Sequence, residues 1–168
     1  MKISRAVVIL ALISSAAAFF GCVSANDNAN ITAAAGSSNS PLENANLAKT
    51  NAEELGLLVN LPYEPTDEDV VWKLDAAGKK LTAVLRFSSE DAKKVVAGAA
   101  GREAPQNTTI SSETWFPPEL IAQSEMSGDD SLKGLSYTAN SFFQAPYASG
   151  RIVRVEGTDY FVLELSAK

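Results

Sequence analysis

The clearest pattern of hydrophobic and polar positions lies in residues 69–87, where two apolar runs flank a short turn-like stretch, and it predicts a β-hairpin. Residues 69–74 and 81–87 are rich in β-branched and aromatic side chains, which is typical of strands. The intervening residues 75–79 contain Gly78 as their fourth member. This spacing fits a type I turn closed by a glycine in the left-handed conformation.

A second hairpin is predicted at the C-terminal end, where residues 151–155 and 160–165 are again strand-like and flank the polar residues 156–159. The sequence leaves the register of this hairpin open, and a two-residue Gly157-Thr158 loop is one way to close the hairpin. With that loop the cross-strand pairs are Val155 with Tyr160, Val153 with Val162, and Arg151 with Glu164. The opposite charges of the last pair, or of Arg154 and Asp159, would account for the two arginines without an anion site.

Between the hairpins, the spacing of apolar residues predicts a helix after residue 88. Ser88 followed by Asp91 is a capping pattern, and Gly98 and Gly101 stand where the helix would end. The residues on its apolar face are Ala92, Val95, Val96 and Ala99. A second, shorter helix is predicted from Pro117-Pro118, because a proline in the first turn loses no helical hydrogen bond.

These elements together predict an α+β domain. Residues 110–115 and 135–139 are further strand candidates, which brings the expected total to between four and six strands. We therefore expect a small, mostly antiparallel sheet, containing the two hairpins, with one or two helices packed on one face. The residues expected to share its core are Trp72, Val84, Val95, Val96, Phe161 and Leu163.

The N-terminal pattern is different and predicts a signal peptide over residues 1–21. Lys2 and Arg5 precede an uncharged, largely apolar run of fifteen residues, 6–20. A helix needs about 20 apolar residues to cross a bilayer, so this run is too short to be a stable membrane anchor. Its charge and length are those of a cleaved export signal.

Residues 16–22, Ala-Ala-Ala-Phe-Phe-Gly-Cys, resemble the lipobox of bacterial lipoproteins. The resemblance covers residues 1–22 and implies cleavage by signal peptidase II before Cys22, with a lipid attached to that cysteine. It also implies a cell-envelope location facing away from the cytoplasm. Where two membranes exist it implies the outer one, because Val23 is not the Asp that commonly marks retention in the inner membrane. The alternative is cleavage after Val23-Ser24-Ala25, which would give a secreted soluble protein.

Residues 22–55 form the lipidated cysteine and a tether, and residues 56–168 form a single globular domain in this interpretation. Most of the segment 23–55 consists of Asn, Ala, Ser and Gly with few large apolar residues. Such a composition buries too little surface to offset the entropy of ordering, so a disordered linker is expected.

Composition excludes several classes of function. The chain has no histidine and one cysteine, so histidine-dependent catalysis, the common zinc sites and a disulfide are excluded. No cofactor or metal motif is present. Without Lys2 and Arg5 the chain keeps 12 basic and 20 acidic residues, a formal charge of −8. This charge disfavours nucleic acid as a partner.

Catalysis by a carboxylate pair is the chemistry that composition still permits. Glu113, Glu119 and Glu125 lie near the aromatic pair Trp115-Phe116, and carboxylates beside aromatic rings can form a sugar site. The simpler interpretation is that these residues are surface acids next to a core tryptophan. Residues 67–69 and 128–131 contain acidic groups that could bind calcium, but neither has the spacing of a calcium-binding loop. We expect no metal site.

Aromatic residues on irregular segments provide the candidate binding surface. The residues are Trp115, Phe116, Tyr137, Phe142, Phe143 and Tyr147. The alternative is that these rings close the core between the hairpins, because so small a domain has few other large residues.

The sequence therefore favours a non-catalytic, lipid-anchored envelope lipoprotein. Its contacts would be with the membrane through the lipid, and with an envelope protein or polymer through the domain. The alternatives are a carboxylate-dependent, carbohydrate-active enzyme and a structural or stress-related surface protein without a specific ligand.

Overall fold

A computed structural model describes residues 47–168. The predicted signal peptide, Cys22 and most of the predicted tether lie outside the described residues. In the described part, no helix is both long and apolar enough to cross a membrane.

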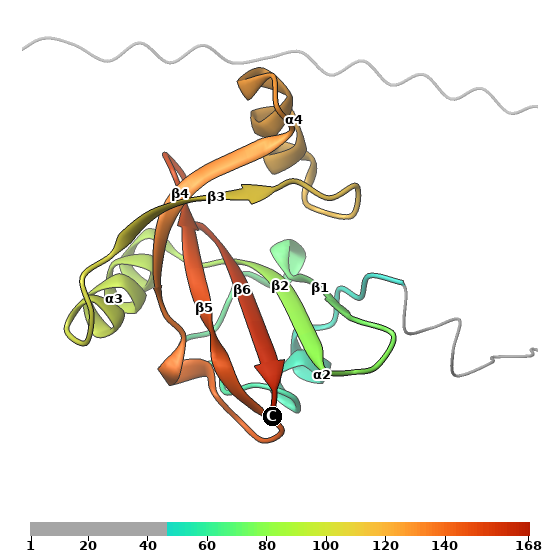
Figure 1. Cartoon of the computed structure of the whole chain (residues 1–168), viewed down its shortest axis with the longest axis vertical. Helices are drawn as coiled ribbons and strands as arrows, with labels where there is room; N and C mark the ends of the chain where they lie inside the picture. Colours follow the sequence, from blue (N-terminus) through green and yellow to red (C-terminus); the bar gives the residue numbers. More distant parts are fainter. Residues whose placement is uncertain (1–46) are drawn as a thin grey trace, which may run out of the picture. The chain divides into compact units, whose positions relative to one another are not determined.

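The domain is built on one six-stranded antiparallel sheet with strand order β1-β2-β6-β5-β4-β3 (Figure 1). The predicted α+β class is confirmed. The strands are β1 (Val71–Leu74), β2 (Lys80–Arg86), β3 (Gln106–Ser111), β4 (Ser131–Thr138), β5 (Tyr147–Val155) and β6 (Tyr160–Ala167). The helices are α2 (Ala52–Gly56), α3 (Ser89–Ala100) and α4 (Pro118–Ser127), with short 3-10 turns η1 (Asp67–Asp69) and η2 (Asn140–Phe142).

Both predicted hairpins are present. In the turn between β1 and β2, Gly78 has a φ of 66°, the left-handed conformation that glycine adopts without steric cost. The Asp75 carboxylate accepts hydrogen bonds from the main-chain N–H groups of Lys79 and Lys80. The second hairpin adopts the register that a Gly157-Thr158 loop would give, with Arg151 opposite Glu164 and Val153 opposite Val162.

Helices α3 and α4 begin as the sequence predicts. The Ser88 hydroxyl caps α3 by accepting a hydrogen bond from the main-chain N–H of Asp91. Helix α4 has a proline in its first turn. Strand β3 differs from the prediction of residues 110–115, because it covers 106–111. After it, the main-chain N–H of Phe116 bonds to the carbonyl of Glu113, and this turn ends the extended segment.

The two helices pack on opposite faces of the sheet, which corrects the expectation of a single covered face. Consecutive residues Phe161 and Val162 are both fully buried, although their side chains point to opposite faces. Each face therefore carries a core. The first core, against α2 and α3, includes Trp72, Leu81, Leu85, Phe87, Val95, Phe161 and Leu163. The second core, against α4, includes Val84, Ile110, Phe116, Leu120, Leu132, Val153 and Val162.

The predicted core is therefore divided, because Val84 belongs to the second core. Val96 is only partly buried at the edge of the first core. The four other predicted residues do pack in the first core: Trp72, Val95, Phe161 and Leu163.

The folded domain begins earlier than the predicted boundary at residue 56. Lys49 and Trp72 exchange two main-chain hydrogen bonds, of 2.7 and 2.8 Å. The side chain of Asn51 caps α2 by accepting a hydrogen bond from the N–H of Glu54. Helix α2 itself buries Leu55 completely. Residues from Lys49 onwards are thus part of the domain and close the outer edge of β1.

Candidate binding groove

A groove of about 1000 Å³ lies between the β3–β4 end of the sheet and the turn that joins β5 to β6. We call it the groove and define it by six of its lining residues: Asn107, Thr109, Lys133, Leu135, Arg154 and Asp159.

Cross-strand pairing builds the floor of the groove. Asn107 on β3 is opposite Leu135 on β4, which in turn is opposite Arg154 on β5. One step along the same face, Thr109 is opposite Lys133. Directly paired residues project their side chains to the same side of a sheet. Arg154 is also opposite Phe161 of the first core, so the groove is on the face that α3 covers farther along.

The side chain of Arg154 is held in place by several contacts. Its guanidinium donates hydrogen bonds to the Asp159 carboxylate at 2.8 Å and to the main-chain carbonyl of Thr158 at 3.1 Å. The same carboxylate accepts a hydrogen bond from Ser89 at the start of α3. Arg154 keeps about a third of its side chain exposed, so it can still contact a ligand. The predicted pairing of Arg154 with Asp159 is confirmed, as is that of Arg151 with Glu164.

Lys133 lines the groove with an exposed side chain. No ion pair involves it in the described part of the chain. Its neighbour across β4 and β3, Thr109, is also exposed and uncharged. Across β4 on the other side, Glu156 also lines the groove with an exposed side chain, and its main-chain N–H donates to the carbonyl of Lys133. Among the described residues, Lys133 is therefore a cation without an ion pair, with an acidic side chain next to it on the β5 side.

A second polar cluster borders the groove where Arg86 and Tyr160 line it. Asp69 accepts hydrogen bonds from Arg86 at 3.1 Å and from the Tyr160 hydroxyl at 2.9 Å. Burial raises the pKa of Tyr160 to about 12, and its hydrogen bond to Asp69 acts in the same direction. The hydroxyl therefore stays protonated at neutral pH and supplies no phenolate base or nucleophile.

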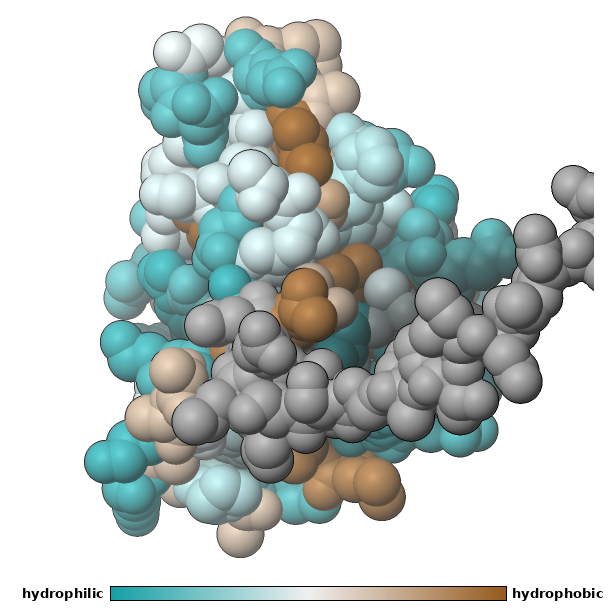
Figure 2. Space-filling view, turned by 90° about the vertical axis from the view of Figure 1, so that its right-hand side faces the viewer, coloured by the Kyte–Doolittle hydropathy of each residue, from teal (hydrophilic) through white to brown (hydrophobic). Residues whose placement is uncertain are grey.

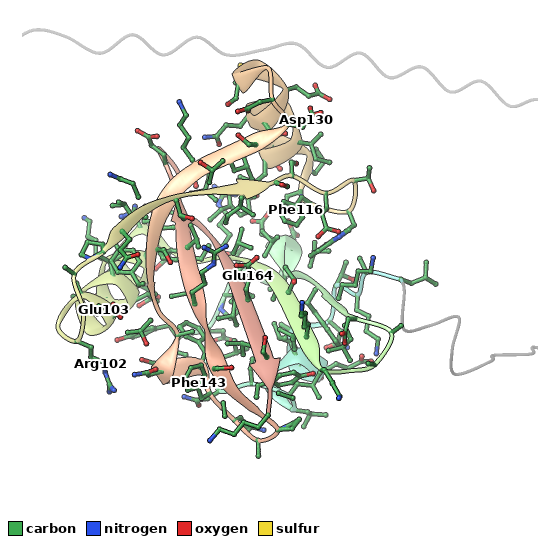
Figure 3. The ribbon with its side chains drawn as sticks, viewed as in Figure 1. Arg102, Glu103, Phe116, Asp130, Phe143 and Glu164 are labelled. Atoms are coloured by element: carbon green, nitrogen blue, oxygen red, sulfur yellow. The ribbon has the colours of Figure 1, made fainter. Side chains whose placement is uncertain are left out.

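Most of the aromatic residues predicted to bind a ligand are buried instead. Four are at most 6% exposed, namely Phe116, Tyr137, Phe142 and Tyr147, while Trp115 and Phe143 are half-buried. They are not one surface, because Phe116 lies in the second core and Phe143 packs against the first. Figure 3 shows these two residues well apart. Core formation, the alternative interpretation, explains their positions.

The predicted carboxylate pair does not border the groove. Glu113, Glu119 and Glu125 are all exposed and lie on α4 or just before it, and none of them lines the groove. The indole N–H of Trp115 donates a hydrogen bond to the Glu113 carboxylate. This bond explains why Glu113 lies next to an aromatic ring without invoking a sugar site. In residues 47–168, no group of three or more Asp, Glu, Cys or His side chains is arranged to hold a metal ion.

The surface offers little apolar area for recognition. Among residues 47–168, the large hydrophobic residues with exposed side chains are Leu47, Leu57, Leu135 and Met126, and they come from four different segments. On the side seen in Figure 2, hydrophobic residues form small separate patches among hydrophilic ones. Binding at this domain would therefore depend on polar contacts such as those in the groove.

Sequence reasoning did not find the groove. Its polar side chains are spread over β3, β4 and the β5–β6 turn, and only the pairing of distant strands brings them together. The one local signal is the polar run 106–109, Gln-Asn-Thr-Thr, whose threonines favour a strand with little to bury. Comparisons of the chain with models of protein families, with curated proteins and with solved structures found no match.

Proposed function

We propose that this protein is a lipid-anchored protein of the cell envelope that binds a protein or envelope polymer through the groove. The anchor is supported by the lipobox-like residues 16–22, which end in Cys22. The observation that carries the binding role is the groove itself. It is a hollow of about 1000 Å³, and beside the neutral side chains of Asn107 and Thr109 its lining carries both basic and acidic groups, among them the exposed Lys133 and Glu156.

Binding fits this groove better than catalysis does. Arg154 and Asp159 form an ion pair, and Arg86 is engaged by Asp69. The Tyr160 hydroxyl is kept protonated by its raised pKa. These groups are suited to holding a ligand in one orientation, because each is already fixed by a neighbour. A general acid and base would instead need two groups free to exchange protons with a substrate.

The anchor can be tested with Cys22→Ser. A serine hydroxyl cannot form the thioether to the lipid, so the variant should accumulate as uncleaved precursor and incorporate no palmitate analogue. The wild-type protein should be labelled and should fractionate with membranes. A wild-type protein that is unlabelled and fully soluble would support secretion instead, with cleavage after Ala25.

The groove can be tested in intact cells by photo-crosslinking. A photoreactive amino acid replaces Leu135, which is 38% exposed in the groove, or Met126, which is 83% exposed on α4. Met126 is the matched control because it is more exposed but lies outside the groove. We expect an adduct of defined mass from position 135 and none from position 126. Equal labelling at both positions, or none at 135, would contradict the proposal.

A further inference from the structure

The two edges of the sheet differ. The outer edge of β1 is closed by Lys49, which exchanges main-chain hydrogen bonds with Trp72. Strand β3 is at the other end of the strand order. Among residues 47–168, no further segment pairs with its outer edge. An edge strand of this kind is a template for the addition of another strand.

The register shows which main-chain groups of β3 face outward. The N–H of Ser112 donates to the carbonyl of Asp130 at 2.8 Å, so positions 112 and 130 form a hydrogen-bonded pair. In an antiparallel ladder such pairs alternate. The even-numbered residues of β3 therefore bond to β4. The N–H and C=O groups of Asn107, Thr109 and Ser111 point away from it.

The same residues direct an added strand towards the groove. Asn107 and Thr109 have their side chains in the groove, and a residue paired opposite either of them would project to the same side. Alternate side chains of an added strand would therefore lie over the groove. The nearest charged side chain on the row of Thr109 is that of Lys133, and Glu156 follows one strand farther from the β3 edge.

We propose that β3 accepts an extended acidic peptide from a partner protein as a seventh strand of the sheet. This inference rests on the proposed function and names the class of partner. The peptide's main chain bonds to Asn107, Thr109 and Ser111, and its alternate carboxylates lie near Lys133. Main-chain pairing supplies affinity and the groove supplies selectivity, as in other cases of strand addition.

Charge complementarity distinguishes this partner from a second copy of the chain. Strand β3, Gln-Asn-Thr-Thr-Ile-Ser, has no charged residue. A second β3 paired with the first would therefore bring no carboxylate from the strand itself to Lys133. The charged residues nearest its start, Arg102 and Glu103, lie in the connection from α3 (Figure 3) and are of opposite sign.

A proline at the outward-facing position tests the main-chain contact. Thr109→Pro removes an N–H that points away from β4, a position where proline is tolerated in an edge strand. Thr108→Pro is the matched control for the direction of the main-chain N–H. The N–H of Thr108 faces β4, so losing this group should lower the unfolding midpoint. The probe is a short capped peptide that alternates Glu and Thr. We expect the full-length protein with Thr109→Pro to keep its unfolding midpoint and to lose affinity for the probe by about tenfold or more.

Amide hydrogen exchange on the unaltered protein provides a test that does not depend on a variant folding. Saturation with the Glu-Thr peptide should slow exchange at Asn107, Thr109 and Ser111. It should leave the amides of β1 unchanged. Slower exchange elsewhere but not at these three amides would overturn the proposal.

Charge reversal tests the selectivity. Lys133→Glu should weaken binding of the Glu-Thr peptide and strengthen binding of a matched peptide that alternates Lys and Thr. Equal affinity of the wild-type protein for both peptides, or for neither, would overturn the acidic-peptide assignment. If the protein associates with itself and Thr109→Pro abolishes this association, the occupant of the β3 edge is a second copy of the chain and not an acidic peptide. Crosslinks from position 135 that persist in Thr109→Pro would leave the proposed function standing and exclude strand addition.

Discussion

The indole N–H of Trp72 donates a hydrogen bond of 3.0 Å to the main-chain carbonyl of Asn51. Trp72 is 2% exposed, so this bond ties a core residue of β1 to the segment just before α2. Lys49 adds two main-chain hydrogen bonds and places its ammonium 4.9 Å from the centre of the Trp72 ring. The segment 49–51 is therefore a structural part of the sheet.

Removing this segment should destabilise the domain. A chain that begins at Glu53 loses the bonds of Lys49 and Asn51 to Trp72 and the N-terminal cap of α2. We expect its free energy of unfolding to be about 4 kcal/mol lower than that of a chain beginning at Leu47, at roughly 1 kcal/mol for each of these four hydrogen bonds. Denaturant unfolding of the two chains measures the difference. Identical midpoints would show that the segment contributes nothing.

Phe161→Ala and Phe142→Ala should both be strongly destabilising. Phe161 is fully buried and packs edge to face on Phe87, with ring centres 5.5 Å apart. Phe142 is 2% exposed in the same core. Each truncation should cost about 3–5 kcal/mol, the usual loss for a buried phenylalanine. Equilibrium unfolding measures both losses. A loss below about 1 kcal/mol for Phe142→Ala would contradict the burial of that ring.

Alkaline pH should destabilise the protein through Tyr160. Its pKa is raised to about 12 in the folded state, whereas a tyrosine in the unfolded chain titrates near pH ~10. The folded state therefore holds a proton that the unfolded state releases, and the free energy of unfolding falls as pH rises between those values. The slope should be shallower in Tyr160→Phe. It should not vanish, because burial also raises the pKa of Tyr147. Parallel slopes for wild type and variant would contradict this role of Tyr160.

Gly134→Ala should disrupt the β4–β5 pairing beside the groove. A methyl group there would clash with the main-chain carbonyl of Arg154 and lie 2.8 Å from a methyl carbon of Val153. Because the carbonyl is part of a paired strand, we expect a loss of about 1–3 kcal/mol, as for other overpacked sites.

Gly98→Ala is the control for that substitution. Gly98 lies within α3, and a methyl group would meet no atom within 4 Å. This change should stabilise the protein by about 0.5–1 kcal/mol, because alanine is the better helix former. Thermal unfolding of the two variants should give shifts of opposite sign.

The predictable parts of the fold are those fixed by neighbours in sequence. The Gly78 turn, the Ser88 cap and the Arg151–Glu164 register each depend on residues within about one turn or hairpin. Local patterns carry no information on which face of the sheet a helix covers, so the separation of α3 from α4 was not anticipated. The uninterrupted apolar run at 160–163, Tyr-Phe-Val-Leu, does indicate a strand buried on both faces.

The candidate site was missed for a related reason. Asn107, Leu135 and Arg154 become neighbours only when three strands pair, and each is unremarkable in its own segment. The aromatic residues were predicted as a binding surface because large rings on irregular segments can be identified from the sequence alone. Their burial is decided by contacts with distant segments, as when the hydroxyl of Tyr147 bonds to the carbonyl of Gly78.

The contact between Lys49 and Trp72 also gives the domain a direction. It places the beginning of the described chain against β1, while β3 is five strands away in the order of the sheet. At about 4.8 Å per strand, this is a path of roughly 24 Å across the sheet. The described chain therefore enters the sheet at its closed edge, and the β3 edge is the part of the sheet farthest from that entry. A strand added to β3 would therefore not displace the segment 49–51 from β1.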